Sequence, residues 1–310
     1  MVARGRVHRK HFLKRVWDQR ALVLMALPAF LIVLVFSYIP MYGISIAFQK
    51  FKPLKGMFNM NVQWVGLKYF EKFFQSPYIF RLLRNNLLLG VYSLLWGFPL
   101  PIIFAVLLDQ LHARRFKKVV QTISYLPHFL SVVVLVGMIK MLFASNGIVN
   151  DVIKWTGGEP IYFLISPRWY RTLFIGSGIW QGLGWSSIIY LAALTNVDPQ
   201  LMEAAVVDGA NRFQRVWNVS LPALMPTISI QLIFSISGIM SASTEKTLLL
   251  YNEATYEVGD VIGTYVYREG ILGGAFEYTT AIGLLMSIVS LVLITLANYG
   301  SRLFSENSLW

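Results

Sequence analysis

Long apolar stretches alternate with short polar ones along most of this 310-residue chain. A helix needs about 20 consecutive, mainly apolar residues to cross the hydrocarbon core of a bilayer. The apolar runs are long and lack the period-two alternation of barrel strands, so helices are the expected spanning elements. The pattern predicts an all-α membrane protein with six transmembrane helices. The expected spans are 21–48, 85–108, 119–144, 170–194, 223–244 and 279–300.

The first 20 residues form a basic tail that runs from Arg4 to Arg20 and precedes the first apolar run. A basic segment followed by an apolar one is also typical of a signal peptide. This run, however, continues for more than about 25 residues without a small-residue cleavage site, so we expect a retained first span. The tail (1–20) is expected to lie on anionic lipid headgroups. It precedes a single transmembrane domain (21–303) and a C-terminal tail (304–310).

Composition supports a membrane protein, because 56% of the residues are hydrophobic and 14% are charged, against about 25% charged in soluble domains. The chain has no cysteine, and its four histidines form no i, i+4 pair, so no metal site is expected. The formal net charge of +12 favours a membrane surface or a polyanionic partner. Because the basic residues lie beside apolar spans, we expect membrane lipids and no nucleic acid as partners.

A polar interruption between the fourth and fifth spans has the signals of a short helix. Asp198 is a good N-cap, and Pro199 suits the first helical position because its missing N–H would be unpaired there anyway. Gly209 supplies a left-handed stop, after which Asn211 can start a second helix at an angle. A helix of about ten residues is marginal alone. It therefore needs a partner surface, in its own bundle or on another protein.

The same segment carries a spaced motif, Glu203-Ala204-Ala205, then Gly209 after three residues, then Val219-Ser220-Leu221-Pro222 after nine more. It resembles the EAA loop (here 198–222) of permease subunits in binding-protein-dependent ABC importers, with valine in place of the family's isoleucine. The alternative is a plain interhelical connector. The resemblance implies a cytoplasmic coupling helix that docks on an ATPase. The implied coupling residues are Glu203, Ala204, Ala205, Asp208, Gly209, Arg212, Leu221 and Pro222.

Most of the chain, roughly 10 to 303, is similar to the carbohydrate-uptake branch of these permeases, through the stretches 121–138, 146–158 and 256–284. These stretches are more similar to importers of complex oligosaccharides or polysaccharides, such as alginate importers, than to maltose-type ones. The resemblance implies a second homologous permease, two cytoplasmic ABC ATPase subunits and an extracytoplasmic solute-binding protein. It also implies the bacterial cytoplasmic (inner) membrane. ATP and Mg²⁺ would be bound by the ATPases, with no cofactor in this chain.

Orientation follows weakly from charge, since Lys and Arg are nearly balanced between the two sides of the predicted topology. The positive-inside rule then gives a slight preference for a cytoplasmic N-terminus. The resemblance decides the matter, because a coupling loop must face the ATPase. Both termini are therefore expected in the cytoplasm.

A carbohydrate path should combine aromatic platforms with amides and hydroxyls, and the fourth and fifth spans carry such side chains. Polar groups inside hydrocarbon are costly and usually face a bundle interior or an aqueous path, so polar contacts between helices are an equal alternative. For the lysine of the third span the alternative is a side chain that reaches the interface. An acidic glycan would suit that lysine, although lipid headgroups suit it as well. The candidate path residues are Lys140, Trp180, Gln181, Trp185, Tyr190, Gln231 and Ser235.

The sequence lacks a phosphate-binding G-x-x-x-x-G-K-[ST] motif and any evident catalytic set, so no catalytic residue and no enzyme activity are expected. Two alternatives from other classes remain. An ion-driven secondary transporter would need carboxylates inside the membrane, and an enzyme of lipid-linked glycans would need an acid–base pair. A late acidic segment is expected to be a solvated surface that faces the binding protein. Its acidic residues are Glu253, Glu257, Asp260 and Glu269.

Overall fold

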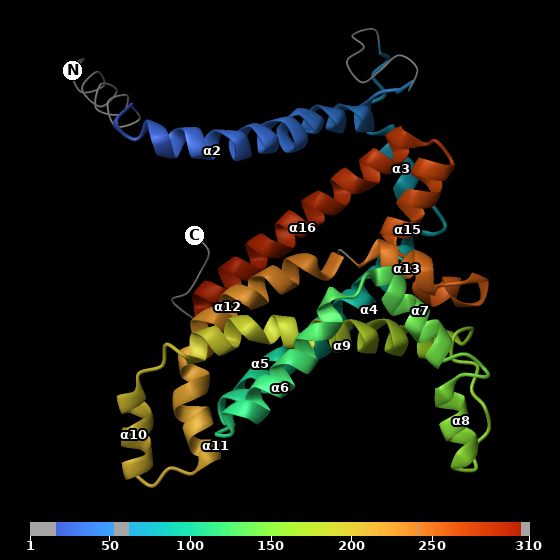
Figure 1. Cartoon of the computed structure of the whole chain (residues 1–310). Coiled ribbons are helices and arrows are strands. Elements are labelled where there is room, and N and C mark those ends of the chain that lie inside the picture. The colour runs from blue at the N-terminus through green and yellow to red at the C-terminus, as the bar shows by residue number, and fades with distance from the viewer. Residues whose placement is uncertain (1–16, 53–61, 241, 305–310) are drawn as a thin grey trace.

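The computed structural model describes residues 17–52, 62–240 and 242–304, with side chains as far as residue 300. Over these residues the chain is helical, and its sole extended pairing is an isolated bridge between Gln49 and Trp64. The predicted all-α class is confirmed (Figure 1). Most of the basic tail and of the C-terminal tail lies outside the described residues.

The helices in chain order are α2 (Arg20–Val33), α3 (Lys68–Phe74), α4 (Ile79–Gly97), α5 (Pro99–Asp109), α6 (Arg114–Tyr125), α7 (Val132–Leu142), α8 (Ile148–Trp155), α9 (Pro167–Leu194), α10 (Pro199–Val207), α11 (Arg212–Arg215), α12 (Leu221–Ser237), α13 (Thr244–Leu250), α14 (Tyr256–Gly259), α15 (Ile262–Val266) and α16 (Phe276–Phe304). Short 3-10 and π segments extend several of them. Those segments are Leu34–Tyr38, Ile39–Phe48, Leu126–Phe129, Val216–Ser220, Gly238–Met240, Glu253–Thr255 and Tyr267–Leu272.

Several of these helices are long and apolar enough to cross a bilayer. Among the described residues they are Arg20–Phe48, Ile79–Asp109, Arg212–Met240 and Phe276–Gly300, with a fifth span if a bent pair in the middle of the chain counts as one. α9 has 28 residues, but its glycines, serines and glutamine make it less apolar than these. The structure therefore gives a multi-span membrane protein, while the count of six spans stays a prediction.

α9 lies across the middle of the molecule, where it packs against α4, α5, α6 and α12 (Figure 1). Its crossing with α6 is very close, because a Cβ added at Gly184 would lie 2.1 Å from the carbonyl oxygen of Ser124. Small residues allow such approaches between membrane helices. α9 begins at Pro167, three residues before the predicted span, since proline fits the first turn of a helix.

α2 and the segments that continue it to Phe48 lie apart from the rest of the chain (Figure 1). No residue of α2 is buried. Only the end of this long helix packs on α16, where Ile46 and Ala47 are buried. The predicted span 21–48 matches this helix. Its apolar surface is left for lipid or for another subunit.

The predicted third span, 119–144, is wrong as a single helix. Arg114–Phe129 and Val132–Leu142 meet at an angle of 102°. Pro127 cannot continue the hydrogen-bond ladder, and Ser131 starts α7 as an N-cap, accepting from the N–H of Val134 at 3.3 Å. The break places α6 and α7 on different parts of α9.

The second span was predicted to begin at Asn85 and Asn86, but α4 starts at Ile79. Both side chains are buried and bond backbone far along the chain. Asn85 donates to the carbonyl of Asp260 at 3.0 Å, and Asn86 accepts from the N–H of Ile262 at 3.1 Å. In the sequence these two asparagines suggest the start of a helix. In the structure they form hydrogen bonds that link α4 to the α14–α15 segment.

Asp260 corrects the expectation of a solvated acidic surface. Its side chain is fully buried, and its carboxylate lies 3.0 Å from the guanidinium groups of Arg81 and Arg268. The hydroxyl of Thr264 donates to the same carboxylate at 2.8 Å. Buried charges are stable only when paired and hydrogen-bonded. The carboxylate of Asp260 thus links Arg81 of α4, Thr264 of α15 and Arg268 of the segment Tyr267–Leu272.

Candidate functional site

The segment between α9 and α12 begins as its sequence predicts. The carboxylate of Asp198 accepts a hydrogen bond from the N–H of Gln200 at 2.9 Å, which caps α10. Pro199 occupies the first helical position. A side-chain cap satisfies one of the N–H groups that a helix start leaves unpaired. The cap fixes where α10 begins relative to the end of α9.

The end of α10 is a left-handed turn at Gly209, where φ is +76°. The N–H of Gly209 donates to the carbonyl of Val206 at 3.0 Å, and the N–H of Ala210 donates to the carbonyl of Ala205 at 2.9 Å. These two bonds make up a Schellman motif, the usual helix stop with glycine. The predicted stop is confirmed. It turns the chain back so that α11 lies beside α10.

Asn211 starts the second helix through a reciprocal capping box with Gln214, with bonds of 2.8 and 2.9 Å. This helix is longer than the sequence suggests, because Arg212–Met240 is a single helical stretch of 29 residues. α11 is therefore the end of the long helix that contains α12. The turn at Gly209 therefore leads directly into that long helix.

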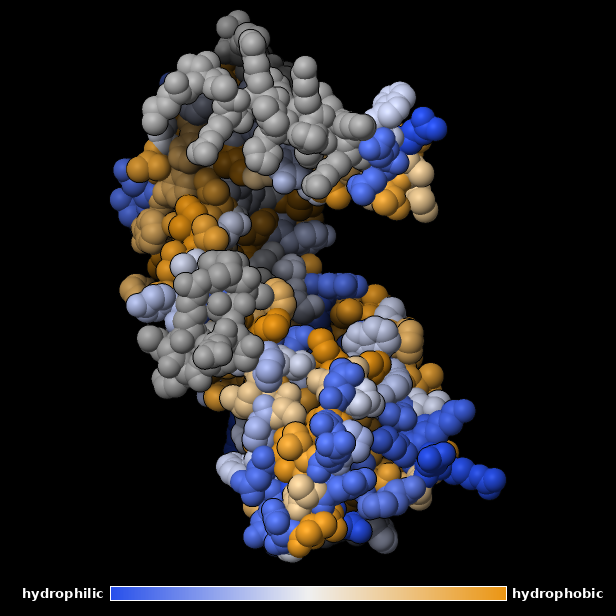
Figure 2. All heavy atoms as spheres, turned by 90° about the vertical axis from the view of Figure 1, so that its left-hand side faces the viewer, coloured by the Kyte–Doolittle hydropathy of each residue, from blue (hydrophilic) through white to orange (hydrophobic). Residues whose placement is uncertain are grey.

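The surface of this segment is open. No residue of α10 is buried, and α10 and α11 project side by side beyond the other helices (Figure 1). Figure 2 shows mixed hydrophilic and hydrophobic atoms on the lower part of the molecule, where these two helices project. The apolar side chains of Val207 and Phe213 are 87% and 74% exposed. Of the predicted coupling residues, the exposed ones are Glu203, Ala204, Asp208, Gly209, Arg212 and Pro222, and the half-buried ones are Ala205 and Leu221.

The inner end of the segment is anchored in the bundle. Leu221 packs against a buried cluster in which Leu224 of α12 meets Leu108 of α5 and Leu191 of α9. Leu224 is fully buried. The segment thus has one exposed face and one end that is fixed to α5 and α9.

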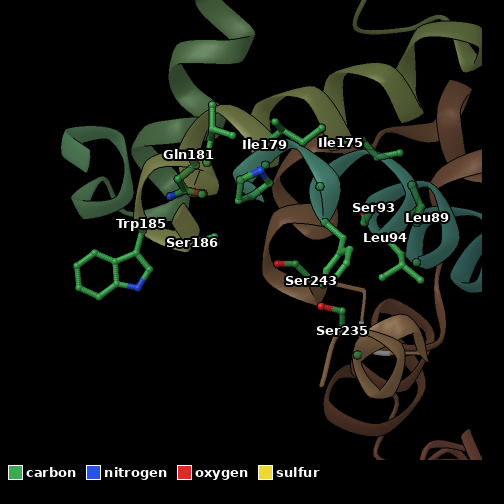
Figure 3. Close-up of a pocket in the computed structure, with 18 of the residues that line it drawn as sticks. Leu89, Ser93, Leu94, Ile175, Ile179, Gln181, Trp185, Ser186, Ser235 and Ser243 are labelled. Atoms are coloured by element: carbon green, nitrogen blue, oxygen red, sulfur yellow. The ribbon is translucent and has the colours of Figure 1, made fainter. Parts of the chain in front are cut away.

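A cavity of about 720 Å³ lies between α4, α5, α9, α12 and α13. It falls within the usual range for ligand sites, about 300–1,000 Å³. Figure 3 shows Gln181 and Ser186 of α9 at this cavity, with Ser235 and Ser243 on the opposite ribbon. The predicted path residues that line it are Gln181, Trp185, Tyr190, Gln231 and Ser235.

Trp185 stands at the edge of the cavity, away from the other labelled side chains (Figure 3). Its ring stacks on that of His128, with centroids 4.4 Å apart and planes 1° apart, and Phe129 meets it edge-on. The amide of Gln181 donates to the carbonyl of Leu130 at 2.9 Å. Both side chains therefore contact the break between α6 and α7, which the sequence did not predict.

Trp180 and Lys140 lie elsewhere. Trp180 lines a separate cavity of about 430 Å³ between α7 and α9, together with Leu135 and Leu173. Lys140 is exposed on α7 and lines neither cavity. The helical periodicity of α9 explains the first result, because Trp180 is five residues before Trp185 and so points to a different face.

Lys246 is a cavity residue that the sequence did not single out. It is 6% exposed, and its ammonium group donates to the carbonyl of Phe174 at 2.6 Å. The same group lies 4.7 Å from the centroid of the Phe174 ring. Burial lowers the pKa of Lys246 to about 8, so the amine is still mostly protonated at neutral pH. Only the fold of α13 onto α9 reveals this position.

In the part of the chain that the structure describes, no group of three or more His, Asp or Glu side chains is arranged to hold a metal ion. The cavity offers hydroxyls, amides, aromatic rings and one ammonium group. Those groups suit a polar ligand with hydroxyl groups, such as a carbohydrate.

Comparison with known proteins shows one family. Residues 97–306 match the family model described as binding-protein-dependent transport system inner membrane component. The polygalacturonan/rhamnogalacturonan transport system permease protein YteP of Bacillus subtilis is 42% identical over 303 residues, which cover 97% of this chain and 94% of YteP. The arabinooligosaccharides transport system permease protein AraP of Halalkalibacterium halodurans is 27% identical, over 86% of this chain and 83% of AraP.

Two solved structures have the same fold. One is a bacterial ABC transporter involved in the import of the acidic polysaccharide alginate, with a TM-score of 0.86 and 38% identity over 94% of this chain and 98% of that one. The other is the bacterial alginate ABC transporter in complex with an alginate pentasaccharide-bound periplasmic protein. Its TM-score is 0.85, with 37% identity over 96% of this chain and 99% of that one.

Proposed function

This chain belongs to the family of binding-protein-dependent transport system inner membrane components, and we propose that it forms, with a second permease, the path of an acidic oligosaccharide across the membrane. It is a permease subunit of an ABC importer, and its relatives are transport proteins, not enzymes. The observation that carries the proposal is the pairing of an open helix turn, α10–α11, with a polar cavity that shares α9 and α12.

Two of these proteins have names that support an acidic substrate, whereas AraP is named for arabinooligosaccharides. YteP is named for polygalacturonan and rhamnogalacturonan, and a neighbour of known structure for alginate. All of these polymers carry uronate carboxylates. The substrate that we propose is a short uronate-containing oligosaccharide delivered by a solute-binding protein.

The partners that we propose follow from the family. Two cytoplasmic ATPase subunits bind ATP and Mg²⁺, and one of them receives α10 and the Gly209 turn. The exposed Glu203, Asp208 and Arg212 give that surface its charge. A rigid-body movement of α10 is passed to α12 and α9 through the contacts of the half-buried Leu221 and the buried Leu224.

The experiment that tests this function is ATP hydrolysis by the purified complex of both permeases with the ATPases. Binding protein loaded with an oligogalacturonide is expected to raise the hydrolysis rate above that of the complex alone. A rate that does not respond to the loaded binding protein, in a complex that contains all the subunits, would contradict the proposed coupling.

We propose that α10 faces the cytoplasm and that α8 faces the outside. The natural chain has no cysteine, so single cysteines report one position each. Val207→Cys on α10 and Trp155→Cys on α8 replace side chains that are each 87% exposed. In right-side-out vesicles, an impermeant maleimide is expected to label the cysteine on α8 and to reach the one on α10 only after permeabilisation. Labelling of the α10 cysteine in sealed vesicles would refute this topology.

Trp185 is proposed as the aromatic platform of the path, and Trp180 provides a matched control on the same helix. Trp185→Ala is expected to reduce oligogalacturonide uptake by about tenfold, because a lost aromatic contact costs up to about 1.5 kcal/mol and about 1.4 kcal/mol corresponds to a factor of ten. Trp180→Ala removes an equally exposed ring outside the cavity and is expected to retain most uptake. Equal loss in the two variants would show that the ring of Trp185 has no special role.

A further inference from the structure

Lys246 places a positive charge inside the cavity wall. Ser243 caps the start of α13, accepting from the N–H of Lys246 at 3.3 Å, and so fixes the first turn that carries the lysine. The side chain crosses to α9, where its ammonium group meets the carbonyl and the ring of Phe174. A Cβ at Gly178 would come within 3.3 Å of the ammonium nitrogen, so the glycine leaves this group room.

The charge of Lys246 has no counter-ion in the described part of the chain. The ion pairs there join Asp260 to two arginines, Glu257 to Arg84, and Asp151 to Lys154. Lys246 takes part in none of these pairs, so no carboxylate oxygen of the described residues lies within 4 Å of its ammonium group. An ammonium group has three donors, and within the described residues this one has a single acceptor, the carbonyl of Phe174. Burying a cation without an anionic partner costs free energy. The site around Lys246 therefore lacks an anion that the described residues do not supply.

A second cation, Arg171, lies on α9 about one turn before Phe174, the residue that the Lys246 ammonium contacts. Arg171 donates to the amide oxygen of Asn85 at 3.3 Å, forms no ion pair within the described residues, and leaves its Nε buried without a hydrogen-bond partner. Residues 171 and 174 are three apart, so they lie on one side of the helix. Arg171 and the Lys246 ammonium therefore follow one another along the same side of α9, toward the α8 end of the molecule.

We propose that Lys246 is the residue of the transport cavity that recognises the carboxylate of an acidic oligosaccharide, with Arg171 as the preceding cationic contact. This inference rests on the proposed function and adds the residue that selects for charge. A uronate carboxylate would accept the two free ammonium donors. Ser235, Ser243 and Gln231 line the same cavity and offer hydrogen bonds to hydroxyl groups.

The test is uptake of a labelled oligogalacturonide into proteoliposomes that hold the complete importer. Lys246→Gln keeps one donor for the carbonyl of Phe174 but loses the charge, and Lys246→Arg keeps the charge. We expect Lys246→Gln to lower uptake by at least about tenfold, as the loss of one partner from a buried charge pair does. Lys246→Arg should recover a large part of that loss. The matched control is Lys140→Gln, which removes an exposed lysine on α7 and should leave uptake near that of the natural protein.

The outcomes separate the two claims. If the natural importer hydrolyses ATP but takes up no oligogalacturonide, the acidic substrate of the proposed function is wrong. If the natural importer takes it up and Lys246→Gln does so equally well, the role of Lys246 is wrong. If Lys246→Gln and Lys246→Arg lose uptake alike, together with the melting temperature of the complex, the lysine serves only to hold α13 on α9. That result also overturns the inference.

Discussion

Replacing Gly209 with valine is expected to reduce ATP-driven uptake by at least about tenfold, because a left-handed backbone costs a residue with a Cβ about 1–2 kcal/mol. The backbone at Gly209 has a φ of +76°, and a Cβ there would meet no atom within 4 Å. The cost is therefore conformational and not steric. It falls on the turn that sets α10 against α11, so the docking surface changes shape while the membrane helices keep their packing.

Gly209→Asn is the matched control, because asparagine adopts the left-handed conformation more readily than other residues with a Cβ. It is expected to retain more uptake than Gly209→Val at an equal amount of protein in the membrane. The measurement is ATP-dependent uptake together with recovery of the ATPase subunits on the purified permease. Normal uptake and normal ATPase recovery in the valine variant would show that this turn does not matter for coupling.

Gly184→Val is expected to prevent the helices from packing into the folded bundle. The added Cβ would lie 2.1 Å from the carbonyl oxygen of Ser124 and 2.9 Å from the ring of Tyr125. Backbone on the neighbouring helix cannot rotate away, so the cost should exceed the about 1–3 kcal/mol of ordinary overpacking. The crossing of α6 and α9 would have to open.

Gly176→Val is the control for this variant. It puts the same β-branched residue into α9, where a Cβ at position 176 meets nothing within 4 Å. The yield of monodisperse protein in detergent and its melting temperature are expected to fall for Gly184→Val and to stay near natural values for Gly176→Val. Equal behaviour of the two variants would mean that α6 and α9 do not cross as closely as the structure has them.

Local signals explain which parts of the fold the sequence predicted. Asp198, Pro199 and Gly209 define α10 through bonds to neighbours within five residues, and their effects can be read from the sequence. The break between α6 and α7 was missed although Pro127 and Ser131 mark it. The residues on both sides of the break are apolar, so the sequence there has the length and hydropathy of one continuous span.

Tertiary contacts explain the rest. The sequence suggests a helix start at Asn85 and Asn86, but their hydrogen-bond partners lie at least 86 residues away along the chain. Helical spacing places Gln231 and Ser235 on one face of α12, and both line the cavity. The same spacing does not show which face of α9 lines it. Lys246 follows the fifth predicted span, and no local pattern in the sequence shows that α13 folds back onto α9.

Transport of an oligogalacturonide into proteoliposomes tests the central claim most directly. The vesicles hold both permeases and the ATPases, with ATP on the ATPase side and loaded binding protein on the other. Uptake is predicted to require ATP, the ATPases and the binding protein together, and to be insensitive to collapse of proton and sodium gradients. Uptake that continues without ATP, driven by an imposed ion gradient, would contradict the account and favour a secondary transporter.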